Sequence, residues 1–276
     1  MSHHKIEVRN LHFSYPDGHE AIKNMSFSIY HGESVGIIGA NGAGKSTLLM
    51  LLMGVYFPDG GEVLVGDVRV TKKTLPMIRQ RLGMVFQDPD DQLFMTTVYE
   101  DVAFGPRNYK LEEEDVERRV MQALEKVGIP HLKDRAPYKL SGGEKRSAAI
   151  ASVLSMQPDV LIMDEPTSGL DPKSRRRVID LLKSFKHTKI ITSHDLDMVL
   201  ETCKRIIVIK KGEIAADGTA VDILSNEDLL NSCGLELPLS LQNCPVCGAS
   251  KGKFGYIHEK IVVDKEAKKE LRLTRE

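Results

Sequence analysis

The sequence predicts an α/β protein in three parts: an antiparallel β subdomain at the N-terminus, a core around a parallel sheet, and a helical insertion within that core. Three observations favour this fold class. Apolar residues alternate over two stretches before residue 31, strand-like and helix-like segments alternate after residue 160, and the stretch before that has helical spacing. Alternating strands and helices imply a parallel sheet with right-handed crossovers, and such sheets carry ligand sites at the carboxyl ends of their strands.

The composition excludes several classes of protein. The 276 residues suit one large domain, or one domain with an appendage, and the formal net charge of −1 offers nucleic acid no long-range basic field. No apolar run approaches the roughly 18 residues that span a bilayer, and the N-terminus has no apolar signal core. The four cysteines do not form the disulfide framework of a secreted domain. We therefore expect a cytosolic protein without a nucleic-acid partner.

The antiparallel subdomain comes first along the chain. Residues 6–15 and 22–30 alternate apolar and polar side chains on either side of a turn at residues 16–18, which predicts two paired strands. Residues 62–70 predict a further strand pair around Gly66 and Asp67. We expect the fold to start with an antiparallel sheet.

A phosphate-binding loop follows the apolar run at residues 34–38 and precedes a helix-like segment at 48–53. The pattern G-x-x-x-x-G-K-[ST] lets backbone N–H groups turn inward around a phosphate, and the helix N-terminus adds its dipole. We expect Lys45 to reach the β and γ phosphates and the Ser46 hydroxyl to bind Mg²⁺. A Gly-rich strand-to-helix turn that binds nothing is the alternative. The residues predicted to contact nucleotide here are Gly39, Asn41, Gly42, Ala43, Gly44, Lys45, Ser46 and Thr47.

The helical insertion is predicted at residues 88–157. A short apolar strand at 83–86 precedes it and delivers Gln87 at its end. Within the insertion, residues 112–127 and 141–156 have the spacing of two helices. Gln87 is a candidate to complete the magnesium shell and to report the γ-phosphate to the insertion; a strand-terminal polar residue without that role is the alternative.

The core resumes at the apolar strand 160–163, which ends in Asp164 and Glu165. We expect Asp164 to hold the magnesium shell and Glu165 to polarise the attacking water; the alternative is a buried strand that runs into an acidic turn. His194 follows the next predicted strand and is a candidate to bond the γ-phosphate and the water. The later elements are predicted as helix 172–185, strand 189–191, helix 196–203, strand 206–209, a final strand pair after 210–212, and a short helix 220–224.

A second candidate anion site is the turn Leu140-Ser141-Gly142-Gly143 at the start of a helix. The same residues also fit an N-cap at Ser141 with a capping-box Glu144, and both interpretations can hold at once. Two phosphate-facing loops that lie far apart in one chain indicate that each nucleotide is sandwiched between two copies, or between this chain and a paralogue.

The chain carries a set of motifs in a fixed order: the phosphate loop, Gln87, Leu140-Ser141-Gly142-Gly143, Asp164-Glu165, Ser168-Gly169-Leu170-Asp171 and His194. With this set, the chain resembles the ATP-binding subunit of an ABC transporter over about residues 5–225. The resemblance implies an ABC-type P-loop NTPase fold, ATP and Mg²⁺ as ligands, and an ATP-hydrolysing enzyme. It implies a head-to-tail dimer in which Ser141, Gly142 and Gly143 touch the γ-phosphate held by the other subunit, and in which Asp171 couples the two sites. It also implies that Tyr15 stacks on adenine, where an ordinary strand aromatic is the alternative.

The segments 85–94 and 98–106 narrow the likeness to the ATPases of energy-coupling-factor importers, and there to the cobalt or nickel branch. That resemblance implies a transmembrane coupling subunit, a substrate-binding membrane subunit, and a peripheral position on the cytoplasmic face of the membrane. The positions it marks for contact with the coupling subunit are Asp90, Asp91, Gln92 and Phe94. The sequence departs from the family at Glu144, where glutamine is frequent, and at Ser147, where arginine is usual.

Several alternatives stay open at this point. The chain can be a shared energising ATPase for vitamin import, an exporter ATPase, or a soluble ABC protein outside transport, and its dimer can pair identical chains or paralogues. Residues 226–276 form an extension without an assigned role. Within it, Cys244-Pro245-Val246-Cys247 resembles one knuckle of a zinc ribbon that Cys233 or His258 would complete; two reduced surface thiols are the alternative.

Overall fold

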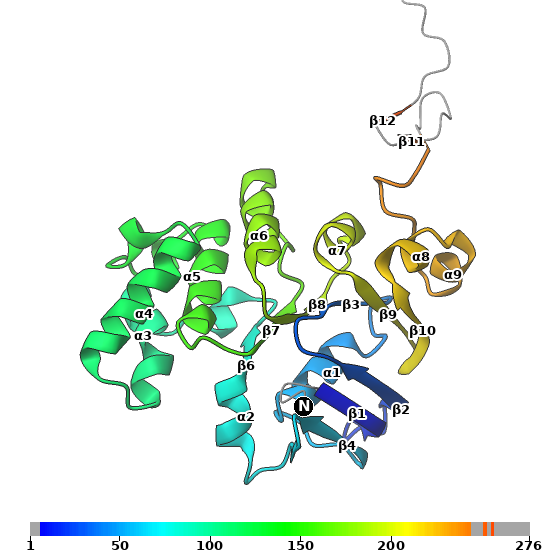
Figure 1. Cartoon of the computed structure of the whole chain (residues 1–276), viewed down its shortest axis with the longest axis horizontal. Helices are drawn as coiled ribbons and strands as arrows, with labels where there is room; N and C mark the ends of the chain where they lie inside the picture. Colours follow the sequence, from blue (N-terminus) through cyan, green and yellow to red (C-terminus); the bar gives the residue numbers. More distant parts are fainter. Residues whose placement is uncertain (1–5, 244–250, 253–254, 257–276) are drawn as a thin grey trace, which may run out of the picture.

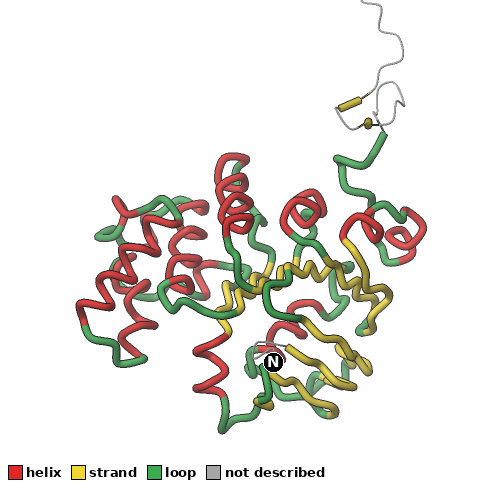
Figure 2. The backbone as a smooth tube through the Cα atoms, in the orientation of Figure 1, coloured by secondary structure: helices red, strands yellow, loops and turns green. Residues whose placement is uncertain are grey.

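The computed structural model describes residues 6–243, 251–252 and 255–256. Its described part has three regions that Figure 1 separates clearly: a small antiparallel sheet, a larger sheet across the centre, and a group of helices on the left of the view. The tube in Figure 2 shows the central strands running between helices above them and the antiparallel sheet below. The predicted α/β class is confirmed.

The antiparallel sheet has the strand order β2-β1-β4-β5. Its strands are β1 (Ile6–Ser14), β2 (Glu20–Ile29), β4 (Gly60–Val65) and β5 (Val68–Arg69). Ile6 pairs with Ile29 on one side and with Val65 on the other, and all three side chains are buried. The alternating pattern of β1 therefore puts one face of the sheet into the core.

The central sheet has the order β10-β9-β3-β8-β7-β6, and every pair except β10–β9 is parallel. The strands are β3 (Ser34–Ile38), β6 (Leu82–Val85), β7 (Val160–Asp164), β8 (Thr188–Thr192), β9 (Arg205–Lys210) and β10 (Glu213–Thr219). Because β3, β6, β7 and β8 run in the same direction, the residues that follow them meet at one edge of the sheet. This edge carries the candidate site.

Both faces of the central sheet are buried. Ile37, Ile162 and Ile190 belong to one hydrophobic cluster, together with α1 (Lys45–Leu52) and the antiparallel sheet. Their neighbours Ile38, Leu161 and Ile191 belong to a second cluster on the opposite face. That second cluster includes residues of α6 (Pro172–Ser184), α7 (Leu196–Thr202) and α8 (Ala220–Leu224). Two-sided burial explains why these strands read as continuous apolar runs.

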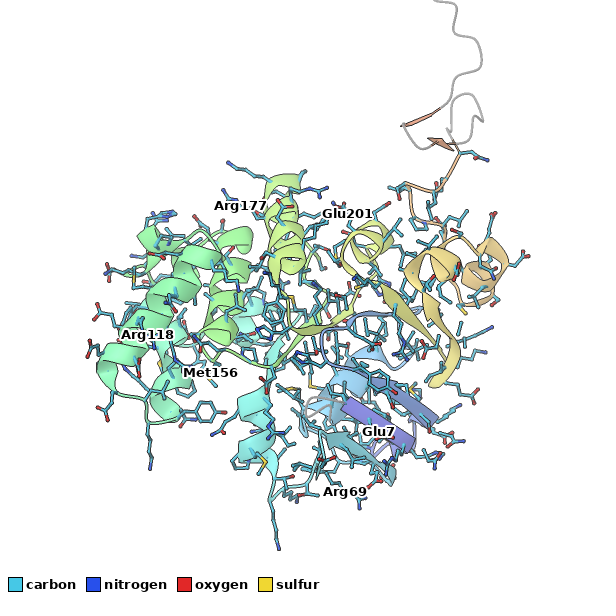
Figure 3. All side chains as sticks on the ribbon, viewed as in Figure 1. Glu7, Arg69, Arg118, Met156, Arg177 and Glu201 are labelled. Atoms are coloured by element: carbon cyan, nitrogen blue, oxygen red, sulfur yellow. The ribbon has the colours of Figure 1, made fainter. Side chains whose placement is uncertain are left out.

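The helical region consists of α3 (Val98–Asn108), α4 (Glu113–Lys126) and α5 (Gly142–Leu154), with short 3₁₀ turns at Pro89–Asp91, Pro130–Leu132 and Pro137–Lys139. On α4 the predicted apolar positions are buried, as its spacing required. Helix α3 closely approaches the residues just after α5 at Gly105, since a Cβ there would lie 2.1 Å from the sulfur of Met156. Figure 3 labels Met156 in this region, well apart from Glu7 and Arg69 on the antiparallel sheet.

Two short helices were not anticipated from the sequence. Helix α2 (Leu75–Arg81) buries only Ile78, so it leaves no apolar period to detect. Helix α9 (Glu227–Ser232) lies in the extension and buries Leu230. Cys233 and Leu235 join Leu230 in the same hydrophobic cluster as α8, so the extension packs on the core as far as the structure describes it continuously.

Beyond residue 243, the described chain consists of two short paired strands, β11 (Lys251–Gly252) and β12 (Gly255–Tyr256). Across the described ranges, no helix combines the length and apolar character that a membrane span requires.

Candidate nucleotide-binding and catalytic site

A cavity of about 560 Å³ lies at the edge where the parallel strands end. It is lined by residues 41–47 of the phosphate loop and by Gln87, Glu165 and His194, which follow β6, β7 and β8 respectively. Tyr15, which directly follows β1 of the antiparallel sheet, also lines it. The structure therefore brings most of the predicted site residues around one space.

The phosphate loop passes close to neighbouring backbone, which explains two of its glycines. A Cβ on Gly39 would lie 2.2 Å from the carbonyl oxygen of Ile209, and one on Gly44 would lie 2.6 Å from that of Ala21. Gly44 also has a φ of 108° and is the N-cap of α1. Only glycine fits both positions, and the loop is thereby held in the shape that points N–H groups at an anion.

Lys45 is a buried cation that faces this cavity. Its Nζ donates to the carbonyl oxygens of Gly39 at 2.8 Å and Ala40 at 3.2 Å, and it lies 3.2 Å from Nε2 of His194. Burial lowers the pKa of Lys45, while the charges of Glu165 and Asp164 oppose that shift. A desolvated ammonium group held by neutral carbonyls is suited to pairing with a phosphate.

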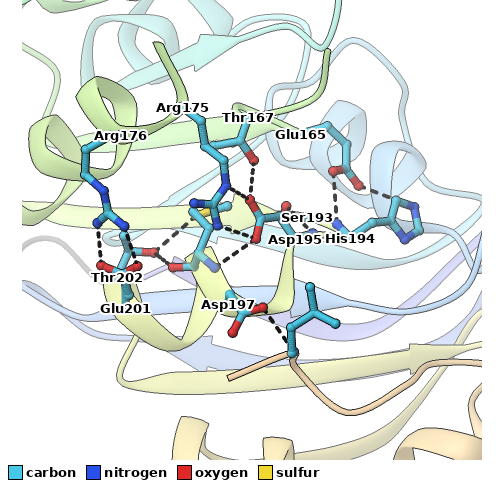
Figure 4. Close-up of polar contacts among 12 residues, drawn as sticks. Glu165, Thr167, Arg175, Arg176, Ser193, His194, Asp195, Asp197, Glu201 and Thr202 are labelled. Atoms are coloured by element: carbon cyan, nitrogen blue, oxygen red, sulfur yellow. Dashed lines mark hydrogen bonds and ion pairs between the residues drawn. The ribbon is translucent and has the colours of Figure 1, made fainter. Parts of the chain in front are cut away.

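Glu165 combines strain and an unpaired oxygen. Its φ of 46° lies in the left-handed region, which side chains such as glutamate rarely adopt. Its Oε2 accepts the backbone N–H of His194 at 3.0 Å, whereas its buried Oε1 has no hydrogen-bond partner and lies 3.4 Å from His194 Nε2 (Figure 4). A strained backbone and a buried carboxylate oxygen without a hydrogen-bond partner are typical of a side chain that interacts with a reactant.

The predicted magnesium donors share a neighbouring cavity. Ser46, Gln87 and Asp164 line it together, and they offer a hydroxyl, an amide oxygen and a carboxylate. These are the hard oxygen ligands that Mg²⁺ prefers, usually alongside water and substrate phosphates, so the residues present fit this ion. Asp164 is buried and accepts a hydrogen bond from the Thr192 hydroxyl, which holds its carboxylate in place.

Zinc has no comparable support. In the described ranges no three His, Cys, Asp or Glu side chains gather as a metal centre, and Cys233 is buried. Cys244, Cys247 and His258 lie outside the described residues, so the zinc knuckle remains an expectation from the sequence.

Tyr15 lines the cavity just after β1. Its hydroxyl shares a hydrogen bond of 2.8 Å with the Thr47 hydroxyl, and its ring lies nearly parallel to that of His19 at 6.3 Å. His19 also lines the cavity, although the sequence did not mark it. A turn histidine leaves no pattern that would have identified it.

Asp195 is a second residue that the sequence did not mark. It lines the cavity beside His194 and caps α7 by accepting the N–H of Met198. Arg175 and the hydroxyl of Thr167 both bond its carboxylate, as Figure 4 shows. Asp195 thus joins the His194 loop to α6 and to the loop after β7.

The turn at Ser141, Gly142 and Gly143 does not line this cavity. A Cβ on Gly143 would lie 2.2 Å from the Ser174 hydroxyl and 3.6 Å from Oδ2 of Asp171, so the turn lies against the start of α6. Asp171 caps that helix through the N–H groups of Lys173 and Ser174. The second predicted anion site is therefore separated from the phosphate loop within one chain.

The predicted capping box is present at the same turn. The N–H and hydroxyl of Ser141 donate to Oε2 of Glu144 at 2.8 and 2.9 Å, and the Glu144 N–H donates back to the Ser141 hydroxyl. These bonds hold the pKa of Glu144 below its usual value, so a charged carboxylate stands beside the Ser141 hydroxyl at neutral pH. The capping role is observed, and the anion-binding role stays a prediction.

The family model described as "ABC transporter" matches residues 22–168. Over 248 residues, 90% of this chain and all of the relative, the chain is 61% identical to a putative ABC transporter ATP-binding protein of Geobacter sulfurreducens. It is 46% identical to the energy-coupling factor transporter ATP-binding protein EcfA of Methanothermobacter thermautotrophicus, over 84% of this chain and 76% of that protein.

Solved structures give the same result. The structure of cbiO1 from Clostridium perfringens, described as part of the ABC transporter complex cbiONQ, has a TM-score of 0.74 and 39% identity over 84% of this chain and 94% of that one. A dimeric ATP-binding cassette, MJ0796, bound to ADP and Pi in a post-hydrolysis state, has a TM-score of 0.71 and 28% identity over 78% of this chain and 98% of that one. The likeness recognised from the motifs is confirmed, and this chain belongs to the ABC transporter family as one of its ATP-hydrolysing, ATP-binding proteins.

Proposed function

We propose that this chain energises an energy-coupling-factor importer, with cobalt or nickel ions as the transported solute, as a peripheral protein on the cytoplasmic face of the membrane. The observation that carries the proposal is the meeting of Lys45, Glu165 and His194 around one cavity, in a chain that resembles cbiO1 and EcfA. The cobalt or nickel preference is supported by the likeness of segments 85–94 and 98–106 to that branch.

Three side chains carry the hydrolytic step in this proposal. Lys45 neutralises charge on the β and γ phosphates, for which its desolvated ammonium group is suited. Glu165 accepts a hydrogen bond from the attacking water through its unpaired Oε1 and polarises it. His194, whose ring lies within 3.4 Å of both Lys45 Nζ and Glu165 Oε1, bonds the γ-phosphate and reports its loss.

The remaining nucleotide contacts follow from the walls of the cavity. Residues 39–47, of which 41–47 line the cavity, cradle the phosphates through their N–H groups, and Tyr15 on the cavity wall stacks on adenine. Ser46, Gln87 and Asp164, which line one cavity, would hold Mg²⁺, and the ion would neutralise negative charge on the phosphates.

A head-to-tail dimer completes the site in this proposal. Ser141, Gly142 and Gly143 lie outside the cavity of their own chain and start a helix, so their N–H groups are available to a nucleotide held by another subunit. Asp171, which caps α6 beside Gly143, is positioned to link the two halves. The partner subunit is a second copy or a paralogue.

The surface proposed for the transmembrane coupling subunit centres on Phe94. Phe94 exposes 64% of its surface and Phe104 exposes 44%, and their rings meet edge to face at 5.0 Å. Asp90 and Asp91 lie on the 3₁₀ turn just before Phe94. Exposed aromatic pairs next to charged residues are typical of protein interfaces. Gln92, in contrast, turns inward and bonds α5, so it serves the fold and is not a contact in this proposal.

Uptake of labelled Co²⁺ and Ni²⁺ in cells that lack this chain tests the proposal, with vitamins as competitors and complementation by wild type, Glu165→Gln or Phe94→Ala. Wild type is expected to restore metal uptake and both variants to fail, while Tyr30→Ala, an exposed aromatic at the end of β2, restores it. Loss of vitamin uptake with unchanged metal uptake would identify a shared energising module instead. Recovery of the protein only in the soluble fraction of native lysates would favour an ABC ATPase outside transport.

A further inference from the structure

Three side-chain links tie the segment that carries Gln87 to α5, the helix that starts at the Ser141 turn. The strongest comes from Arg146, which exposes only 3% of its surface. Its Nη1 donates to the carbonyl oxygen of Phe86 at 2.8 Å and its Nη2 to that of Gln87 at 2.6 Å. One planar guanidinium group thus holds two successive carbonyls in a fixed geometry.

Gln92 provides the second link between this segment and α5. Its Oε1 accepts the N–H of Phe86 at 3.1 Å, and its Nε2 donates to the Ala149 carbonyl at 2.7 Å and the Ser152 hydroxyl at 2.9 Å, both on α5. At the surface, Lys145 Nζ lies 2.6 Å from Oδ1 of Asp90. Both backbone groups of Phe86 and the carbonyl of Gln87 are therefore bonded to α5 directly or through one side chain.

Arg146 also belongs to the space around the magnesium donors. It lines the same cavity as Ser46, Gln87 and Asp164. Because its guanidinium group is buried away from water, Arg146 is a cation kept in a costly position. Its Nε is buried without a hydrogen-bond partner, which packing alone would not favour.

We propose that Arg146 is a positioning residue for ATP hydrolysis: by holding the carbonyls of Phe86 and Gln87, it sets where the Gln87 amide stands relative to Ser46 and Asp164 and ties that position to α5. Arg146 acts through Gln87 and does not itself touch Mg²⁺ or nucleotide. The inference rests on the proposed role of Gln87 in the magnesium shell. Residues that orient metal ligands change metal affinity by about tenfold or more when they are replaced.

The test is the equilibrium affinity of the full-length chain for a non-hydrolysable ATP analogue, measured over a Mg²⁺ titration. The variants are Arg146→Lys, Gln87→Ala and their combination, with Arg118→Lys on the exposed face of α4 as the matched control. Lysine keeps the charge but cannot bond both carbonyls in the two-pronged geometry of arginine. Arg146→Lys is therefore expected to raise about tenfold the Mg²⁺ concentration at which the affinity for the ATP analogue is half-maximally enhanced. The affinity without Mg²⁺ is expected to stay unchanged.

Non-additivity is the decisive readout, because the effects of two substitutions do not add when one residue acts through the other. The double variant is expected to need no more Mg²⁺ than Gln87→Ala alone. If the two effects multiply, or if Arg146→Lys weakens binding equally without Mg²⁺, Arg146 has only a structural role and the inference is overturned. If Gln87→Ala leaves the Mg²⁺ dependence unchanged, the proposed magnesium role of Gln87 fails, and the inference fails with it.

Thermal unfolding of each variant separates these outcomes from misfolding. Should Arg146→Lys not fold, Gln92→Leu takes its place, because it removes the bond to the Phe86 N–H in the same segment. Gln92→Leu is expected to raise the Mg²⁺ concentration for half-maximal enhancement of analogue affinity by less than Arg146→Lys does. If a folded Gln92→Leu protein shows no such rise, the result counts against the proposal.

Discussion

Arg175 and Asp195 form a two-point ion pair that joins α6 to the loop of His194. Arg175 Nε lies 2.6 Å from Oδ2 of Asp195, and its Nη2 lies 2.8 Å from Oδ1 (Figure 4). Helix α6 begins directly after Asp171, and Asp195 directly follows His194. The pair therefore connects the residue proposed to link two subunits with the residue proposed to sense the γ-phosphate.

Arg175→Met is expected to lower the ATPase kcat more than it changes the affinity for nucleotide. The partly buried Asp195 would lose its charged partner, at a cost of about 1 to 2 kcal/mol in unfolding free energy, which lies between exposed and buried pairs. Steady-state kinetics and urea unfolding measure the two effects. The control is Arg176→Met, because Arg176 pairs with Glu201 away from the cavity. Equal losses of kcat in both variants would contradict the link.

Glu165→Gln is expected to keep ATP binding and to reduce turnover by about a hundredfold or more, because the amide cannot polarise water as a carboxylate does. Binding of labelled ATP and release of phosphate are the measurements, with Glu201→Gln as an isosteric control outside the cavity. A Glu165→Gln protein that hydrolyses ATP at nearly the wild-type rate would remove Glu165 from the mechanism.

Glu144→Gln is expected to strengthen ATP-dependent dimerisation. The charged Glu144 carboxylate stands beside the Ser141 hydroxyl, where a partner's phosphate would approach, and the neutral amide oxygen can still accept the Ser141 N–H. Removing one exposed like charge predicts a gain of roughly two- to fivefold in dimer affinity, larger at low salt. Light scattering with ATP in a Glu165→Gln background measures it. Glu114→Gln, in the first turn of α4, is the control.

Stability is expected to fall in acid as Glu201 gains a proton. Hydrogen bonds from Arg176 and Lys183 lower the pKa of Glu201 from 4.5 to about 2. Because the folded-state pKa is the lower one, this stabilisation is complete above about pH 4.5 and is lost as the pH falls toward 2. Urea unfolding between pH 6 and pH 3 should show a shallower decline for Glu201→Gln than for wild type. Parallel curves for the two proteins would contradict the assignment.

Asp197→Ala is expected to loosen the extension where it crosses α7. The Asp197 carboxylate accepts the N–H of Leu239 at 3.1 Å and of Ser240 at 2.9 Å. Hydrogen exchange of these two amides should accelerate, with a loss of about 1 kcal/mol in unfolding free energy. Asp197→Asn retains one acceptor and should give an intermediate rate. Unchanged exchange in Asp197→Ala would mean that other contacts hold the segment.

The sequence by itself determined the fold class and most of the residues that line the cavity, although not His19 or Asp195. Gly39, Gly44 and Lys45 lie in one short loop, and their identities follow from local backbone sterics and phosphate chemistry. Glu165 and His194 could be placed together in advance because parallel strands deliver their following residues to the same edge. Periodicity likewise located α4, whose buried face is long enough to leave a pattern.

The tertiary structure alone decided the contacts between helices and loops that are distant in the chain. The bonds from Arg146 to the Gln87 segment and from Arg175 to Asp195 depend on which helix packs against which strand end, and no local pattern records that choice. The inward orientation of the Gln92 side chain, which bonds α5, likewise depends on how the helices pack. Short helices such as α2 bury a single side chain, so they depend on their neighbours and carry no period of their own. Local sterics and periodicity act within a few residues, whereas these contacts arise from packing across the whole core.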